Sequence, residues 1–205
     1  MTDFDEKAPT WDANPIRVER ARAVAQGIRA SVAITPGMTA LEYGCGTGLL
    51  SFALRPYLAH ITLADSSNGM LAVLDEKIVS GGIQNMTSLK ADFITDPLPE
   101  ARFQLIYSLM VLHHVPDTDK ILGIFYDLLD SPGYLCVADL DKEDGSFHHD
   151  GFTGHHGFDR NELAEQARRA GFRKVEFTTV FNTPRDRDPG TEPTYYPVFL
   201  MTAEK

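Results

Sequence analysis

The sequence predicts an α/β protein whose helices cover both faces of a doubly wound, mostly parallel sheet of seven strands. Two observations predict this class. Apolar runs typical of strands buried on both faces alternate with segments of helical spacing, and the last two runs follow each other without a helix between them. Strands joined by helices run parallel, whereas the closing pair indicates an antiparallel hairpin at one edge. The 205 residues suffice for one such domain, which we expect to span 1–205.

The first half of the chain contains three predicted helices, each followed by a predicted strand. A polar arm is expected over residues 1–14, followed by a helix that begins at Pro15 and ends before the Thr-Pro-Gly at 35–37. Strands and helices then alternate: strands over 38–44, 60–66 and 86–93, helices over 47–58 and from Ser67 to a stop at Gly81. Such repeats place the carboxyl ends of successive strands along one edge of the sheet.

The second half continues the alternation and then changes character. We expect strands over 103–112 and 134–141, helices over 117–133 and 159–171, and a closing hairpin of strands over 172–181 and 195–205. Residues 142–158 are rich in glycine, histidine and aromatic residues without clear periodicity. We expect a long loop there, and its glycines would let it move as a lid over a site.

The charge balance and composition exclude several classes of partner. Nineteen Lys and Arg residues against 29 Asp and Glu residues give a formal net charge of −10, which disfavours attraction to nucleic acid or to anionic lipid. No run approaches the ~18 apolar residues of a membrane span, and the first ten residues lack the blocks of a secretory signal. The two cysteines, Cys45 and Cys136, lie far apart in the sequence, a pattern typical of free thiols in a reducing compartment. We expect a cytoplasmic monomer or homodimer.

The stretch "ALEYGCGTGLLS", residues 40–51, joins the first strand to the helix after it. Ligands of open α/β sheets bind beyond the carboxyl ends of the strands, and a bare backbone there lets a ligand approach closely. The dinucleotide fingerprint G-x-G-x-x-G needs a third glycine where Leu49 stands, because the glycines fall at positions 44, 46 and 48. This spacing argues against a pyrophosphate cradle.

Four motifs follow in order: "LEYGCGTG", "LADSS", "KADF" and "LIYSLMVLHHVPD". Together they resemble the class I S-adenosylmethionine-dependent methyltransferases, nearest to the small-molecule branch that includes enzymes of quinone biosynthesis. The resemblance covers residues 11–205 and implies a Rossmann-like methyltransferase fold. It also implies S-adenosylmethionine as cofactor, S-adenosylhomocysteine as product, and a small-molecule acceptor that is methylated at oxygen, nitrogen or carbon.

The resemblance also implies which residues bind the cofactor. Glu42 is expected near the cationic methionine part, and Asp65, 21 residues after Gly44, near the ribose hydroxyls. Asp92 is expected to accept from the adenine amino group. Tyr43 stands where the family usually carries a smaller aliphatic residue, and we expect it to pack against a helix. The full expected set is Glu42, Gly44, Gly46, Asp65, Ser66, Met70, Asp92, Phe93, Ser108 and Leu109.

Six of the seven histidines lie between positions 113 and 156, as three adjacent pairs. Methyl transfer from a sulfonium mainly needs orientation, and a base helps only where the acceptor loses a proton. His114 and His156 are our candidates for contact with the acceptor or for proton transfer. A metal site is the alternative, but adjacent residues of an extended chain point in opposite directions and chelate poorly, so we expect no metal.

Two other functions remain open at this point. A noncatalytic module that binds S-adenosylmethionine or S-adenosylhomocysteine would carry the same motifs, because methyl transfer has no obligatory catalytic residue. A nicotinamide-dependent oxidoreductase is disfavoured by Leu49 and by the closing hairpin.

Overall fold

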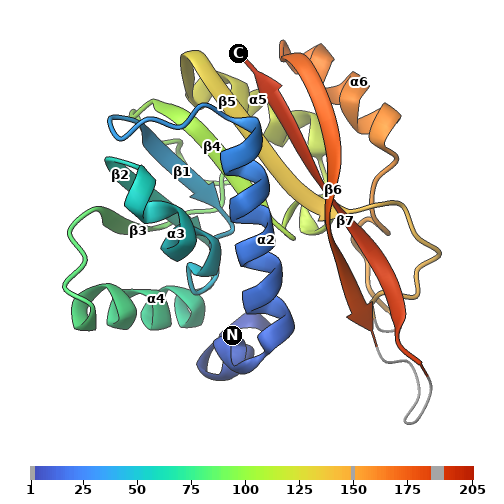
Figure 1. Cartoon of the computed structure of the whole chain (residues 1–205), viewed down its shortest axis with the longest axis horizontal. Coiled ribbons are helices and arrows are strands. Elements are labelled where there is room, and N and C mark those ends of the chain that lie inside the picture. The colour runs from blue at the N-terminus through green and yellow to red at the C-terminus, as the bar shows by residue number, and fades with distance from the viewer. Residues whose placement is uncertain (1–2, 149–150, 186–191) are drawn as a thin grey trace.

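The centre of the computed structural model, which describes residues 3–148, 151–185 and 192–205, is a single sheet (Figure 1). Its strands are β1 (Thr39–Tyr43), β2 (His60–Asp65), β3 (Met86–Lys90), β4 (Phe103–Leu109), β5 (Leu129–Leu140), β6 (Arg173–Arg185) and β7 (Thr194–Glu204). The strand order is β3-β2-β1-β4-β5-β7-β6. The first five positions pair in parallel, and β7 runs antiparallel to both β5 and β6. The predicted doubly wound sheet and its closing hairpin are confirmed.

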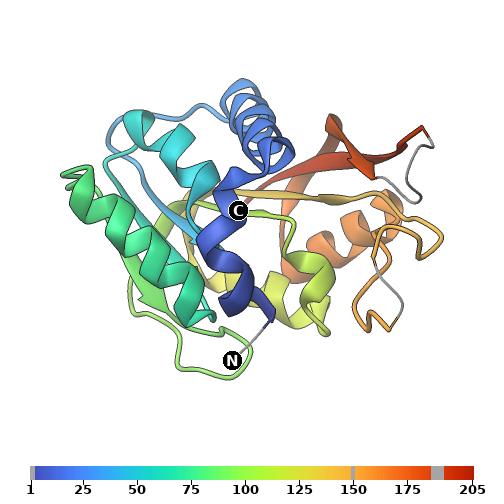
Figure 2. The same cartoon turned by 90° about the horizontal axis from the view of Figure 1, so that it is seen from below.

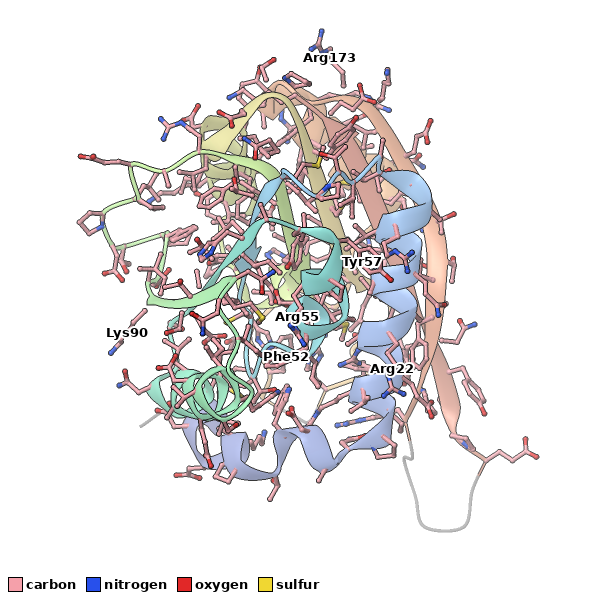
Figure 3. The ribbon with its side chains drawn as sticks, turned by 60° about the vertical axis from the view of Figure 1, so that its left-hand side comes forward. Arg22, Phe52, Arg55, Tyr57, Lys90 and Arg173 are labelled. Carbon is pink, nitrogen blue, oxygen red and sulfur yellow. The ribbon has the colours of Figure 1, made fainter. Side chains whose placement is uncertain are left out.

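Helices cover both faces of this sheet. They are α1 (Asp3–Lys7), α2 (Pro15–Ser31), α3 (Leu49–Leu54), α4 (Asn68–Ser80), α5 (Thr118–Leu128) and α6 (Arg160–Ala170), with short 3-10 turns η1 (Ala8–Ala13), η2 (Arg55–Tyr57) and η3 (Leu112–His114). Apolar side chains of α2, α3 and α4 form one core, and those of α5 and α6 form the other. Figure 3, in which Arg22 of α2 and Phe52 of α3 are labelled, shows these two helices side by side. None of the described helices is both long and apolar enough to cross a membrane.

Local capping interactions fix where the helices begin and end. The Asn14 side chain accepts from the Ile16 N–H at 3.0 Å before α2, and Asp159 accepts from the Asn161 N–H at 2.8 Å before α6. Gly171 ends α6 with φ of 111°, a conformation that residues with a Cβ rarely adopt. The helix predicted over 159–171 therefore has the caps that its sequence indicates.

Several element boundaries differ from the prediction, and the strands expected over 86–93 and 103–112 end early, at Lys90 and Leu109. The helix expected over 117–133 ends at Leu128, because Leu129 is buried and pairs with Phe103, so that the Ser-Pro-Gly lies inside β5. The helix expected over 47–58 begins only at Leu49, after the left-handed Gly48. The strand expected over 172–181 continues to Arg185, because β6 pairs with β7 along that length.

The predicted polar arm is instead helical and packed against the domain. We call residues 3–13, which form α1 and η1, the N-terminal segment. The Asp5 carboxylate accepts from the Ser67 hydroxyl at 2.6 Å and from the Gly69 N–H at 2.9 Å, at the start of α4. Figure 2 shows the segment, in dark blue, crossing in front of the sheet. Its helices depend on these tertiary contacts, which is why the sequence pattern alone did not reveal them.

Replacing Gly69 with alanine is expected to undock the N-terminal segment without unfolding the domain. A Cβ at this position would lie 2.7 Å from the Asp5 Cα and 2.8 Å from its carbonyl oxygen, so backbone must move. Limited proteolysis should then cleave the variant near its N-terminus faster than the wild type. Gly123→Ala is the matched control, because its added Cβ would meet no atom within 4 Å. Equal cleavage of the two variants would contradict the packing described here.

Candidate active site

The glycine turn between β1 and α3 is tightly packed at two of its glycines and less tightly at the third. Gly44, Gly46 and Gly48 have φ of 67°, 53° and 82°, which disfavours residues with a Cβ. A Cβ at Gly44 would lie 2.4 Å from Val111, and one at Gly48 would lie 2.7 Å from Leu74. At Gly46 the nearest atoms, the Met70 Sδ and the Trp11 Nε1, would be 3.9 Å away, which is ordinary van der Waals contact. Gly46 is therefore the position of the turn at which the backbone is least tightly packed.

Asp65 ends β2 beside the turn. Its carboxylate accepts from the Gly46 N–H at 2.7 Å and from the Ser67 N–H at 2.8 Å. Burial raises the pKa of Asp65, and these hydrogen bonds oppose the rise. Each carboxylate oxygen keeps acceptor capacity for a further donor. Ser66 is exposed next to it, while Met70 is buried within α4.

Glu42 lies beneath the turn rather than at its surface. Its side chain is buried and accepts from the Ser51 hydroxyl, whose oxygen lies 2.6 Å from the Tyr107 hydroxyl. Burial raises the pKa of Glu42 to about 8, against the hydrogen bond from Ser51. The group is therefore largely protonated at neutral pH, in contrast to the free carboxylate that the sequence suggested.

The protonation of Glu42 should make stability depend on pH. The folded protein holds this proton up to about pH 8, whereas the unfolded chain releases it near pH 4.5, so stability should fall as pH rises between these values. The slope attributable to one group is at most about 1.4 kcal/mol per pH unit. Urea denaturation from pH 5 to 8 should show a flatter curve for Glu42→Gln, which keeps an acceptor for Ser51 but cannot ionise. The exposed Glu19→Gln should follow the wild type, and parallel curves for Glu42→Gln and wild type would contradict the assignment.

The motif after β3 supplies one polar and one apolar side chain. Asp92 is half-buried, and its carboxylate accepts from the Ile94 N–H at 2.9 Å. Phe93 is buried, with its ring centroid 5.3 Å from that of Tyr43. Tyr43 in turn contacts Phe125 of α5 at 5.3 Å, so the prediction that it packs against a helix is confirmed. Asp92 therefore lies just after the end of β3, next to a ring that is packed in the core.

The carboxyl end of β4 carries an unpaired polar atom. Ser108 is buried, and its Oγ has no hydrogen-bond partner among the described residues. Leu109, the last residue of β4, is half-buried next to it. Because β4 lies directly beside β1 in the sheet, the Ser108 hydroxyl is close to the strand end that leads into the glycine turn. A buried donor of this kind is available to a ligand.

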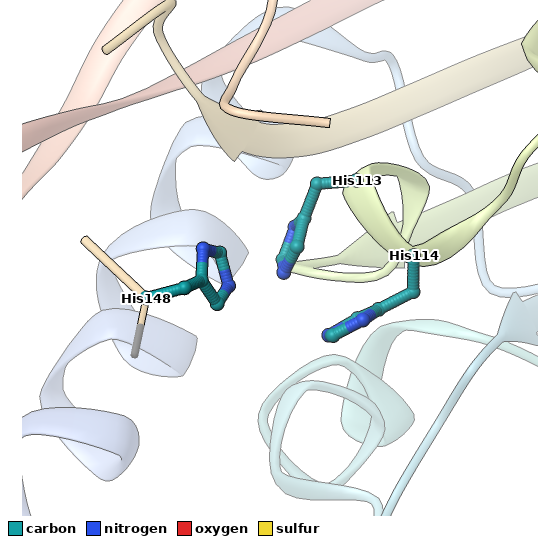
Figure 4. A group of neighbouring side chains, drawn as sticks. All are labelled: His113, His114 and His148. Carbon is teal, nitrogen blue, oxygen red and sulfur yellow. The ribbon is translucent and has the colours of Figure 1, made fainter. Parts of the chain in front are cut away.

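Three histidines from two distant segments meet next to this edge (Figure 4). Nitrogen atoms of His113, His114 and His148 all lie within 4.8 Å of one another. The ring centroids of His113 and His114 are 4.2 Å apart, and those of His113 and His148 are 5.0 Å apart. The adjacent rings lie together because residues 112–114 form the η3 turn, so the expectation that an extended chain would separate them is wrong. We call these three side chains the imidazole cluster.

A buried carboxylate orients the first member of the cluster. Asp139 of β5 lies 2.7 Å from the His113 Nδ1, and both side chains are at most 2% exposed. Burial alone would raise the pKa of Asp139, but His113 and the N–H groups that Asp139 accepts from lower it. An ionised carboxylate has no proton to give, so Nδ1 is the donor in this hydrogen bond and Nε2 is the ring nitrogen that Asp139 does not engage. Sequence reasoning missed this pair, although neighbouring parallel strands place both residues at one edge.

The other two members of the cluster are neutral at pH 7. Burial, followed by the influence of His113, lowers the pKa of His114 and of His148 to about 4 in each case. The Phe152 ring stacks on His148 with centroids 3.7 Å apart. His156, the second sequence candidate, lies outside the cluster, with its exposed ring 3.4 Å from Glu143.

The N-terminal segment covers the space between the glycine turn and the imidazole cluster. The Trp11 Nε1 lies 3.9 Å from a Cβ built at Gly46, and the Phe4 ring lies 5.3 Å from that of His114. The Lys77 ammonium holds the segment from α4 by a 2.6 Å ion pair with Asp12.

The loop expected over 142–158 reaches the cluster from the other side. Phe147 is buried, with its ring 5.2 Å from that of Tyr196, and Phe158 pairs with Asp141 in a short bridge. Residues 149–150, which include His149 of the second pair, lie outside the described residues. The loop thus carries His148 and Phe152 toward the end of β4.

The sequence of this chain is similar to those of known methyltransferases. A family model described as a methyltransferase domain matches residues 17–176. The ubiquinone biosynthesis O-methyltransferase of Marinobacter nauticus is 28% identical over 69% of this chain and 57% of its own length. The chain spans about half the length of the curated relatives it matches.

Solved structures show the same fold at low identity. A chain in the complex of the Haloferax volcanii Trm112 methyltransferase activator superposes with a TM-score of 0.81 at 17% identity, covering 100% of this chain and 98% of that one. The Haemonchus contortus phosphoethanolamine N-methyltransferase 2, solved with S-adenosyl-L-methionine, superposes with a TM-score of 0.72 at 16% identity, covering 100% and 60%. At these identities the likeness concerns the fold alone.

Proposed function

The chain belongs to the methyltransferase domain family, and from this premise we propose that it methylates a hydroxyl oxygen of a small molecule. It is a methyltransferase that depends on S-adenosylmethionine. One observation carries the choice of a hydroxyl acceptor, namely the imidazole cluster held by Asp139 at the carboxyl edge of the sheet. Such an acceptor must lose a proton, and neutral imidazoles are suited to assist that loss. O-methylation is also the reaction in the name of the Marinobacter relative.

The residues around the glycine turn fit the cofactor in their donor and acceptor chemistry. The Asp65 carboxylate, with its remaining acceptor capacity, would hold the ribose hydroxyls beside the exposed Ser66. The backbone of the turn at Gly46 and the unpaired Ser108 hydroxyl would lie along the methionine part. Asp92 would accept from the adenine amino group.

We propose that neighbouring residues make the other contacts with the cofactor. Gly44 and Leu109 would border the methionine part, and Met70 and Phe93 would form the apolar walls of the adenine pocket. Glu42 would act from beneath the turn, where a bound cation favours its ionised form.

The protein's share of the chemistry is orientation, exclusion of water and removal of a proton. S-adenosylmethionine, when bound, supplies a methyl group that a positively charged sulfur already activates. The chain has to align the acceptor oxygen with that methyl group and keep water out, which the N-terminal segment and the loop over 142–158 are placed to do as lids. His114, next to the sheet edge, is the first candidate for contact with the acceptor hydroxyl, and His156 is the second.

A panel of acceptors tests this proposal. The protein is incubated with S-adenosylmethionine and matched small phenols, amines and carbon nucleophiles, and the methylated products are identified by mass spectrometry. We expect turnover of a hydroxyl acceptor that falls at least tenfold in His114→Ala, with His60→Ala, which changes a half-buried histidine at the start of β2, unchanged. Exclusive methylation of nitrogen or carbon would refute the hydroxyl acceptor.

The acidic balance supports the choice of a small molecule as the acceptor, because a net charge of −10 disfavours a nucleic acid. We also propose that the protein acts as a cytoplasmic monomer or homodimer. The comparisons do not favour a noncatalytic binding module or a nicotinamide-dependent oxidoreductase.

A further inference from the structure

We propose that His113, His114 and His148 bind one divalent ion of the late first-row transition metals, with zinc as the representative. The three side chains come from the η3 turn and from the loop after β5, and nitrogen atoms of all three lie within 4.8 Å of one another. Figure 4 shows the three rings gathered around a common space. Four-coordinate zinc sites in which three histidines bind the ion leave one position open.

Asp139 prepares His113 as a ligand. Its Oδ1 lies 2.7 Å from the His113 Nδ1 in a fully buried setting, which fixes the tautomer and leaves Nε2 as the free nitrogen. A second bond, from the His113 backbone N–H to Oδ2 at 3.2 Å, fixes the carboxylate itself. Histidines that bind metals commonly donate their other ring N–H to a carboxylate in this way.

His148 contributes a polar atom that needs a partner. Its Nδ1 is buried and has no hydrogen-bond partner within the described parts of the chain. The stacked Phe152 ring covers one face of the imidazole, 3.7 Å away between centroids. A buried nitrogen without a hydrogen-bond partner is destabilising, and a bound ion at this position would supply the missing partner.

The ligand atoms select the class of ion. Neutral imidazoles favour zinc, cobalt, nickel and copper, whereas magnesium and calcium prefer oxygen ligands. Zinc–nitrogen bonds of about 2.0–2.1 Å place tetrahedral ligand atoms roughly 3.4 Å apart. The nitrogen atoms of the cluster are separated by up to 4.8 Å, so the side chain of His148 would have to rotate toward the other two rings when the ion binds.

The open fourth position gives the ion a role at the acceptor. A hydroxyl group that occupies it would have a lowered pKa, as water does on catalytic zinc. The cluster would then act on the acceptor through the ion instead of as a free base. This role rests on the proposed function, whereas the binding of the ion does not.

Metal binding is tested on the full chain without a histidine tag. The protein is dialysed against a chelator and titrated with zinc chloride by calorimetry, and a cobalt chloride titration is followed by visible absorption. We expect one ion per chain and a tetrahedral cobalt spectrum. His148→Ala and His114→Ala should each weaken binding by about 100-fold, and Asp139→Asn by about 10-fold. His60→Ala, which changes the first residue of β2 at the amino end of the strand, should bind as the wild type does.

Three results would overturn the site: the absence of stoichiometric binding, the same affinity in His148→Ala, or a loss that follows His156→Ala instead of His114→Ala. Circular dichroism of each variant separates loss of the site from loss of the fold. Titration of the same sample with S-adenosylmethionine keeps the two proposals apart. Cofactor binding without metal binding refutes only the metal site.

Discussion

Replacing Asp65 with alanine is expected to weaken the binding of S-adenosylmethionine by about 100-fold. Two hydrogen bonds from ribose hydroxyls to a carboxylate contribute roughly 3 kcal/mol in total, and each 1.4 kcal/mol corresponds to a factor of ten. Isothermal titration calorimetry with S-adenosylmethionine and S-adenosylhomocysteine measures the change directly. Both ligands carry the same ribose, so both affinities should fall together.

Two further variants make the Asp65 result specific. Asp65→Asn keeps one side-chain acceptor and should show an intermediate loss. This variant also tests whether the bonds from Gly46 and Ser67, which stabilise the turn, account for the effect. Asp127→Ala, on the exposed face of α5, should bind as the wild type does. Full affinity in a folded Asp65→Ala protein would show that the ribose lies elsewhere.

Replacing Asp139 with alanine is expected to lower the free energy of unfolding by about 3–5 kcal/mol. The carboxylate and the His113 ring that it orients are both buried, so removal of one leaves the other unpaired. Urea denaturation of the chelator-treated protein measures this change without a contribution from bound ions.

The matched control for Asp139 is a nearby ion pair between the residue that directly follows β5 and the first residue of α6. Asp141 pairs with Arg160 at 2.6 Å, but both side chains are a quarter or more exposed, so Asp141→Ala should cost about 1 kcal/mol or less. The ratio between the two losses is the quantity of interest. Equal losses would mean that Asp139 and His113 do not form the buried pair described here.

The part of the site that the sequence predicted is the part built from local patterns. The glycines at 44, 46 and 48 announce a turn at a strand end, and Asp65 follows at the spacing that places a carboxylate beside it. The central strands β1, β4 and β5 were predictable for a similar reason, because a strand buried on both faces is a continuous apolar run. The family resemblance then gave the ligand.

What the sequence did not reveal depends on contacts between distant residues. The N-terminal segment is too short to be helical alone. Its helices are held by contacts of Asp5 with Ser67, at the start of α4, and of Asp12 with Lys77 of α4. His113 was passed over for His114 because the tight turn after β4 was not visible in "LHH", and its partner Asp139 lies on another strand. The pairing becomes visible only once the two strand ends lie side by side.

A crystal structure of the protein with S-adenosylhomocysteine would show directly whether the cofactor and acceptor sites share the carboxyl edge of the sheet. We expect ribose hydroxyls within hydrogen-bonding distance of Asp65, backbone contact at Gly46, and the sulfur on the side of Ser108 that faces the imidazole cluster. Ribose away from Asp65, or sulfur turned away from the cluster, would contradict this placement. The cofactor and acceptor sites would then not share the carboxyl edge of the sheet.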